Sequence, residues 1–160
     1  MNRLFKLQKA LLSEIDKYEK LVSTKRDQPI EWERIHMASC AKLGYLMGEK
    51  RGIDPILAAA ACAVHDYGRI LNGVQEGHAE YGYEPVMLFL RGTELFNEDE
   101  ISAIGLAVKN HSKKGKIGEP LEEIVKDADI LDFVHFGMRP AREDQQRRYE
   151  ILLTDRENLF

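Results

Sequence analysis

The sequence contains little cysteine: only Cys40 and Cys62 occur among its 160 residues. They form no CxxC pair, so the sequence indicates neither a disulfide framework nor a thiolate zinc site. Both are expected to be buried, reduced thiols. The sequence also lacks an apolar run long enough to cross a membrane, and an apolar signal segment near its start. We therefore expect no membrane association and a cytoplasmic location.

An excess of positive charge is also missing. The chain has 23 basic and 27 acidic residues, which gives a net charge of −4. Broad binding to a nucleic acid polymer is therefore not expected. Repeats, low-complexity tracts and alternating strand patterns do not occur. The 44% hydrophobic and 31% charged residues are typical of an ordinary globular protein, and 160 residues suffice for one domain with a real core.

The helical period, by contrast, occurs almost everywhere. In the first segment, apolar residues recur at spacings of three and four, as on one face of an amphipathic helix: Leu4, Leu7, Leu11, Ile15, Tyr18 and Val22. Similar patterns, together with capping residues and prolines, predict six further helices. They lie at about 31–50, 55–68, 78–90, 97–110, 121–133 and 140–153. The sequence therefore predicts an all-α fold, a single-domain helical bundle.

The stretch Ile56–Arg69, ILAAAACAVHDYGR, organises the chain. Its nine leading apolar residues are followed directly by His65 and Asp66. Gly68 is expected to end this helix, because glycine favours helix C-termini. An alanine-rich helix packs closely on several sides, so His65 and Asp66 should lie in the interior, where unpaired polar groups are costly. A metal ion is one partner that would satisfy both side chains.

Four more imidazole or carboxylate groups have inward positions on other predicted helices. His36 and His111 each share a helix face with apolar residues. Asp129 lies among apolar residues, and His78 begins its helix. Alone, each is explained as a hydrogen-bonded core or capping residue. Together with the His-Asp doublet they form a ligand set suited to Mn, Fe, Co, Ni or Zn. Such a set suits two ions about 3.5–4 Å apart, bridged by the aspartate of the doublet.

Several cations lie next to these candidate ligands in the sequence. Arg69 is one turn beyond His65, and it either contacts a substrate phosphate or forms a structural salt bridge. Lys113 and Lys114 follow His111 in a glycine-bearing loop. Lysines in such loops are commonly solvated. Their position beside a candidate ligand nevertheless predicts that Lys113 or Lys114 contacts phosphate.

These residues resemble the HD-domain superfamily of metal-dependent phosphohydrolases. The resemblance rests on His36, the phrase HDYGR (65–69) and the phrase DADILD (127–132), and it covers about 31–135. The family fold is a helical bundle, in agreement with the predicted helices. In this family one metal is bound by the residues that match His36, His65, Asp66 and Asp129. Binuclear members add two histidines, whose positions His78 and His111 occupy.

The resemblance also divides the single domain, 1–160, into parts. The metal-binding core is expected at 31–135. The segments 1–28 and 140–160 are expected to pack on it as an N-terminal helix and a charged C-terminal helix. His135 is expected to follow the last core helix, where it either reaches the site or stays outside it, and Arg139 is a further nearby cation.

The resemblance implies an enzyme that hydrolyses phosphoesters or nucleotides with metal-activated hydroxide. Asp66 and Arg69 are then the catalytic residues, and Arg69, Lys113 and Lys114 bind phosphate. Two other functions fit the same ligands. One is an HD-fold di-iron oxygenase, which ligand spacing alone does not separate from a hydrolase. The other is a non-catalytic nucleotide-binding module. The full ligand set argues against this module, because buried polar groups are costly and a silent site does not need them.

Overall fold

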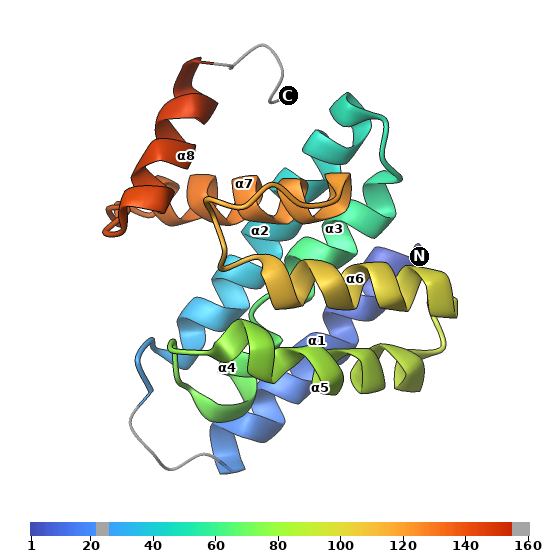
Figure 1. Cartoon of the computed structure of the whole chain (residues 1–160). Helices are drawn as coiled ribbons and strands as arrows, with labels where there is room; N and C mark the ends of the chain where they lie inside the picture. The colour runs from blue at the N-terminus through green and yellow to red at the C-terminus, as the bar shows by residue number, and fades with distance from the viewer. Residues whose placement is uncertain (22–25, 155–160) are drawn as a thin grey trace.

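Helices make up the regular structure of residues 1–21 and 26–154, which the computed structural model describes (Figure 1). No strand occurs in these residues, so the expected all-α fold is confirmed. Val22 of the expected N-terminal helix and the end of the C-terminal segment, 155–160, lie outside the described residues. The helices are α1 (Arg3–Leu21), α2 (Ile30–Arg51), α3 (Pro55–Val64), α4 (Tyr67–Asn72), α5 (His78–Thr93), α6 (Glu98–Asn110), α7 (Pro120–His135) and α8 (Glu143–Thr154).

The alanine-rich helix α3 lies at the centre of the bundle. It packs against α1, α2, α6 and α7, and every residue from Ala58 to Val64 is buried. α2 approaches it closely because glycine occurs where the two helices meet. A Cβ atom added at Gly44 would lie 2.5 Å from Sγ of Cys62, and one at Gly48 would lie 2.9 Å from Cβ of Ala58. The C-terminal end of α3 therefore carries the His-Asp doublet inside the protein.

Local signals set several helix ends where the sequence predicts them. Gly52, in the left-handed region at φ 70°, ends α2. Asp54 caps α3 by accepting two backbone N–H groups of its first turn. Asn97 caps α6 in a capping box with Glu100. These caps fix where α3 and α6 begin.

The expected helix end at Gly68 is wrong. α3 ends before the His-Asp doublet, and Gly68 lies inside the short helix α4. A side chain at Gly68 would overlap the carbonyl oxygen of His78 and lie 2.9 Å from the backbone nitrogen of Gly82. Glycine is therefore required for the packing of α4 on α5, rather than for ending a helix. α4 continues to Asn72, so part of the segment between the predicted helices 55–68 and 78–90 is helical as well.

The outer helices complete the bundle. α1 packs on α2, α3 and α4, α5 packs on α6, and α8 packs on α7. Figure 1 shows α8 at the edge of the bundle, beyond α7.

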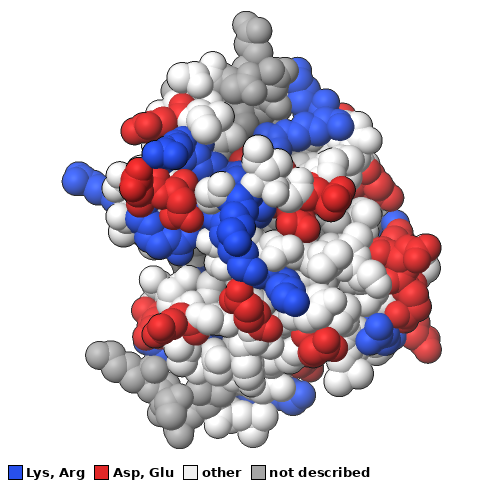
Figure 2. Space-filling model, viewed as in Figure 1, with Lys and Arg blue, Asp and Glu red and all other residues white. Residues whose placement is uncertain are grey.

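Basic and acidic side chains are intermixed on the face shown in Figure 2, which carries no broad basic surface. In the described part of the chain, no helix combines the length and apolar character needed to cross a membrane.

Candidate metal centre

The predicted ligands come from different helices and meet in one buried cluster. His65 follows the last residue of α3 and Asp66 precedes the first residue of α4, so the step between these two helices presents both side chains. The four histidines of the cluster are at most 3% exposed. The remaining members are His36 in α2, His78 at the start of α5, His111 at the C-terminal end of α6 and Asp129 in α7.

Asp66 divides the four histidines into two pairs. Its Oδ2 atom lies 3.4 Å from Nε2 of His36 and 3.2 Å from Nε2 of His65. Its Oδ1 atom lies 3.0 Å from Nε2 of His78 and 3.6 Å from Nε2 of His111. Each oxygen of one carboxylate therefore faces its own pair of imidazole nitrogens. A carboxylate that bridges two cations has this arrangement.

Asp129 joins the first of these pairs. Its Oδ1 atom lies 3.3 Å from Nε2 of His36 and 3.6 Å from Nε2 of His65. Its Oδ2 atom lies 2.5 Å from Nζ of Lys114. The first group thus offers two imidazoles and two carboxylate oxygens, and the second offers two imidazoles and one carboxylate oxygen. The second group leaves more room for water or substrate.

Hydrogen bonds on the far side of each ring determine which nitrogen faces the centre. In His65, His78 and His111, Nδ1 donates to the backbone carbonyl three residues earlier, at 2.7, 2.5 and 2.7 Å. In His36, Nδ1 lies 2.6 Å from Oδ2 of Asp132. These acceptors hold a proton on Nδ1, so each Nε2 presents a lone pair to the centre when its ring is neutral.

These lone pairs face one another across the cluster. Nε2 of His36 lies 3.1 Å from Nε2 of His65, and Nε2 of His78 lies 2.9 Å from Nε2 of His111. Electron-rich atoms at such distances repel each other unless a proton or a metal ion lies between them. Imidazole and carboxylate donors are the types that bind divalent transition metals. The buried residues therefore fit divalent metal binding.

The cluster also favours positive charge. Burial lowers the pKa of His36, but hydrogen bonds to two aspartates outweigh this effect and raise its pKa to about 9. Burial raises the pKa of Asp66, but the charges of Arg69 and His65 outweigh it and hold the pKa of this carboxyl well below its usual range. Burial lowers the pKa of His111 to about 3, so this ring stays neutral. Ionised carboxylates and a neutral ring are the forms that bind metal.

Comparison with known families agrees with this geometry. The HD domain family matches residues 34–134, which is more than half of the chain.

The chain belongs to the HD domain family.

This family consists largely of metal-dependent hydrolases. No curated protein and no solved structure matches the chain. The match takes in α3 to α6 and most of α2 and α7, whereas α1 and α8 lie outside it. Every candidate ligand therefore falls within the HD region.

Two buried carboxylates beside the centre were not predicted from the sequence. Asp132 is 1% exposed and Glu33 is 2% exposed. Asp132 holds the ring of His36, and such outer carboxylates orient a ligand and raise its basicity. Asp132 lies three residues after Asp129, and Glu33 lies three residues before His36. Each is thus one helical turn from a predicted ligand and on the same helix face. This spacing could have identified both carboxylates from the sequence.

Arg69 is a buried partner of these carboxylates. Its Nε donates to Oε1 of Glu33 at 2.8 Å, its Nη2 pairs with Asp66, and its Nη1 donates to Oε1 of Gln75 at 2.6 Å. Burial lowers the pKa of Arg69, but the negative charges of Asp66 and Glu33 outweigh burial, so the pKa is raised. Of the two interpretations of Arg69, this geometry favours the structural salt bridge. The side chain nevertheless lines the cavity at the centre.

The two lysines after His111 lie in different surroundings. Lys114 is 3% exposed, and its Nζ lies beside Asp129. The side chain of Lys113 is 35% exposed and pairs with Glu80 at 3.2 Å. Lys114 lines the cavity at the centre, and Lys113 does not.

The remaining candidates lie away from the centre. His135 is the last residue of α7, so the expectation that it follows this helix is wrong. His135 is exposed and packs edge-on against Phe136, with ring centroids 5.2 Å apart. Arg139 is exposed as well. Neither residue lines the cavity.

Cys40 lies beside the first histidine pair. Its Sγ atom and ring nitrogens of His36 and His65 lie within 4.8 Å of one another. Burial, followed by a hydrogen bond to Cys62, raises the pKa of Cys40 well above its usual value. A neutral thiol is a poor metal ligand, so imidazoles and carboxylates remain the better donors here. Both cysteines are free and buried, as the sequence predicts.

A cavity of about 260 Å³ opens onto the centre. Trp32 and Phe133 form an aromatic part of its wall. The Trp32 ring stacks on the ring of His36, with centroids 4.7 Å apart. Arg142, which precedes α8, lines the cavity and donates to the carbonyl oxygen of Ser112 at 2.7 Å. The cavity thus combines charged groups at its base with an aromatic wall.

Proposed function

We propose that this HD-domain protein is a metal-dependent hydrolase of phosphoesters that uses two divalent ions. One observation carries the proposal: the two oxygens of Asp66 face two separate pairs of histidine nitrogens. A single ion would use only one of these pairs. Four imidazoles and two carboxylates are also more ligands than a single catalytic ion needs, since it must keep a position open.

The ligands divide between the two ions as follows. His36, His65 and Asp129 would hold the first ion, and His78 and His111 the second, with Asp66 shared by both. When bound, such a pair of ions supplies hydroxide near neutral pH and stabilises charge on phosphoryl oxygens.

Other residues of the chain have separate roles in this proposal. Lys114 donates to a phosphate oxygen and neutralises part of its charge, because its buried ammonium lines the cavity. Arg69 orients Asp66, and Asp132 orients His36. Trp32 reduces the access of water to the centre by covering one face of the His36 ring. Lys113 has no catalytic role.

The size of the cavity favours a small substrate. Its volume of about 260 Å³ is less than the roughly 300–1,000 Å³ typical of sites for drug-sized ligands. A phosphate monoester of a small alcohol suits this volume, with its organic part against Trp32 and Phe133. A nucleotide would place only its phosphate inside.

We also propose that residues 1–160 form one domain. The HD core would span about 31–135, with the N-terminal and C-terminal helices packed on it. The packing of α1 on α2 and α3, and of α8 on α7, supports this organisation.

Metal analysis and a phosphoester screen on one preparation test the proposed function. Protein purified without added metal should contain about two divalent transition-metal ions per chain. Chelation should abolish hydrolysis, and adding the metal back should restore it. Turnover without dioxygen should equal turnover in air, because hydrolysis needs no oxidant. A requirement for dioxygen, or nucleotide binding without turnover, would overturn the assignment.

A further inference from the structure

Lys114 is a buried cation in a loop, 112–119, whose other residues are exposed or half-buried. The residue is 3% exposed, whereas Ile117 is 94% exposed. Nζ of Lys114 lies 2.5 Å from Oδ2 of Asp129 and 3.3 Å from the carbonyl oxygen of Lys126. Holding a long side chain in one place costs conformational entropy. Contacts elsewhere must therefore fix the backbone of the loop, 112–119.

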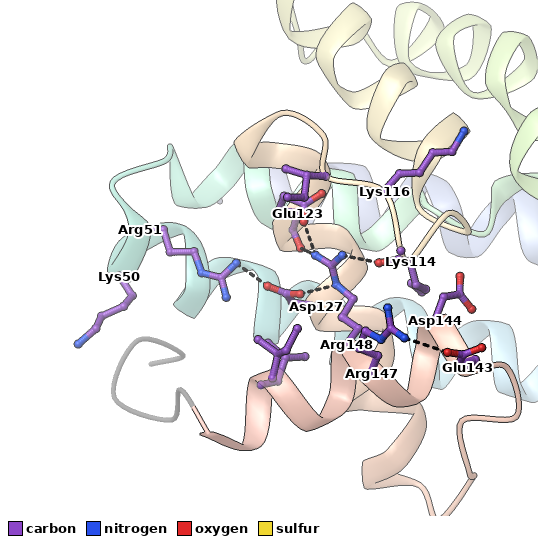
Figure 3. Close-up of a pocket in the computed structure, with 14 residues that line it drawn as sticks. Lys50, Arg51, Lys114, Lys116, Glu123, Asp127, Glu143, Asp144, Arg147 and Arg148 are labelled. Carbon is purple, nitrogen blue, oxygen red and sulfur yellow. Dashed lines mark hydrogen bonds and ion pairs between the residues drawn. The ribbon is translucent and has the colours of Figure 1, made fainter.

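Arg148 of α8 makes one of these contacts. Its Nη1 donates to the carbonyl oxygen of Lys114 at 2.9 Å. Its Nε donates to Oδ1 of Asp127 at 2.7 Å, and its Nη2 donates to Oε2 of Glu123 at 2.5 Å. Figure 3 shows the Arg148 guanidinium between these partners. The other oxygen of Asp127 accepts from Arg51 of α2 at 2.7 Å, so this acceptor is itself held in place.

Glu123 and Lys126 of α7 anchor the rest of the loop. Oε1 of Glu123 accepts from Nζ of Lys126 and from the backbone nitrogen of Gly118, both at 2.8 Å. Nζ of Lys126 also donates to the carbonyl oxygen of Lys116 at 2.8 Å. The anchors on Lys116 and Gly118 thus belong to α7. The anchor on the backbone of Lys114 belongs to α8.

We infer that Arg148 is a positioning residue for Lys114. Through this contact α8, which lies outside the matched HD region 34–134, helps to arrange the metal centre. A cavity of about 1080 Å³ adjoins Arg148 and the loop, so the loop has room to move once the contact is lost. Without Arg148, the carbonyl of Lys114 loses this donor and Nζ is held less firmly at Asp129. The catalytic consequence rests on the proposed function, but the positioning itself does not.

Amine labelling followed by mass spectrometry tests the positioning. Lys114 should be protected in the wild type and should react about tenfold faster or more in Arg148→Ala, because a charge-assisted anchor is lost. Arg147→Ala is the matched control. Its side chain is 72% exposed and pairs with Glu143, so the labelling of Lys114 should not change. Retained protection of Lys114 in Arg148→Ala would overturn the inference.

A double-mutant cycle tests the catalytic consequence. Arg148→Ala should lower kcat/KM about tenfold in the wild-type background. It should have little further effect in Lys114→Ala, because residues that act through one group are not additive. Fully additive losses would overturn the inference. If Arg148→Ala does not fold, Arg148→Met, which keeps an apolar stem but has no N–H donor, replaces it in both measurements.

The two experiments separate the two proposals. A wild type without phosphoester hydrolysis would overturn the proposed function. The labelling of Lys114 would then still decide whether Arg148 positions it.

Discussion

Gly68 of α4 touches the carbonyl group of His78 of α5, and no side chain fits between the two helices at this point. Asp66 lies just before Gly68 in the chain, and Oδ1 of Asp66 lies 3.0 Å from Nε2 of His78. The close approach of the helices therefore sets the distance between the shared carboxylate and one of its imidazole partners.

Gly68→Ala should destabilise the protein and lower its metal content. The added methyl group has to push backbone atoms apart, and overpacking of this kind typically costs about 1–3 kcal/mol. Gly92→Ala, in α5, is the matched control. A Cβ atom there meets nothing within 4 Å, so this change should be neutral or stabilising. Urea unfolding measures both variants, and equal stability of Gly68→Ala and wild type would contradict the packing argument.

Asp66→Ala should abolish metal-dependent turnover, to below about 1% of wild type, because both proposed ions lose a ligand. The chain should stay folded, since Arg69 keeps its bond to Glu33 at 2.8 Å. Circular dichroism and initial rates measure these two outcomes. Asp16→Ala is a suitable control, because Asp16 pairs with Arg34 on the exposed side of the bundle. Substantial turnover in purified Asp66→Ala would exclude a bridging role.

Replacing either second-pair histidine should remove one ion rather than both. His78→Ala and His111→Ala should each lower the metal content from about two ions per chain toward one. His135→Ala should leave it unchanged, because His135 is exposed and does not line the cavity. Elemental analysis measures all three variants. A wild-type value near one that does not fall in His78→Ala or His111→Ala would show that the binuclear assignment is wrong.

The two neighbouring lysines should behave differently. Lys114→Ala should lower kcat/KM by roughly 10–100-fold, because a buried cation that faces the phosphate is lost. Lys113→Ala should have little effect, because this side chain is 35% exposed and pairs with Glu80. Steady-state kinetics at two ionic strengths provides the comparison. Equal losses in the two variants would place the phosphate contact elsewhere in the loop.

Glu123 should make stability depend on pH in the acidic range. Burial raises its pKa, but hydrogen bonds from Lys126 and Arg148 outweigh this and bring it below the ordinary value of 4.5. A carboxyl whose pKa falls on folding stabilises the folded state above the unfolded pKa, and this contribution is lost as the pH drops through the folded pKa. Glu123→Gln should therefore lower Tm at pH 7 by about 2–4 °C.

The difference in Tm between Glu123→Gln and wild type should shrink as the pH falls below 4.5. Thermal unfolding at several pH values measures it. Glu143→Gln is the control, because the Glu143 side chain is 85% exposed and its pair with Arg147 should be weakened by salt. A difference that widens in acid would contradict the assigned direction of the Glu123 pKa.

Much of the helical framework was predictable because its signals are local. Asp54 and Asn97 cap the helices that they precede in the sequence, and Gly52 ends α2 in the conformation expected of glycine. Helical periodicity also indicated the inward faces of His36 and His111, which are both buried. Such signals depend on spacing within one segment, so a single sequence is enough to recognise them.

Relationships between segments were not predictable in this way. Gly68 looks like a helix end until the carbonyl of His78 is placed against it. Lys113 and Lys114 are adjacent in the sequence, and only the path of their loop decides which of them is buried. Arg148 lies in a highly charged helix, where periodicity does not show which cation has a specific partner.

The anchoring of the histidine rings determines how the protein should take up metal. His65, His78 and His111 are each held by a carbonyl three residues earlier in the chain. Their orientation is therefore decided by short stretches of backbone. In small zinc domains the ion drives folding, whereas here backbone carbonyls of the fold hold the three rings. Loading should consequently leave the circular dichroism spectrum unchanged, and its rate should depend on how quickly an ion passes through the mouth of the cavity.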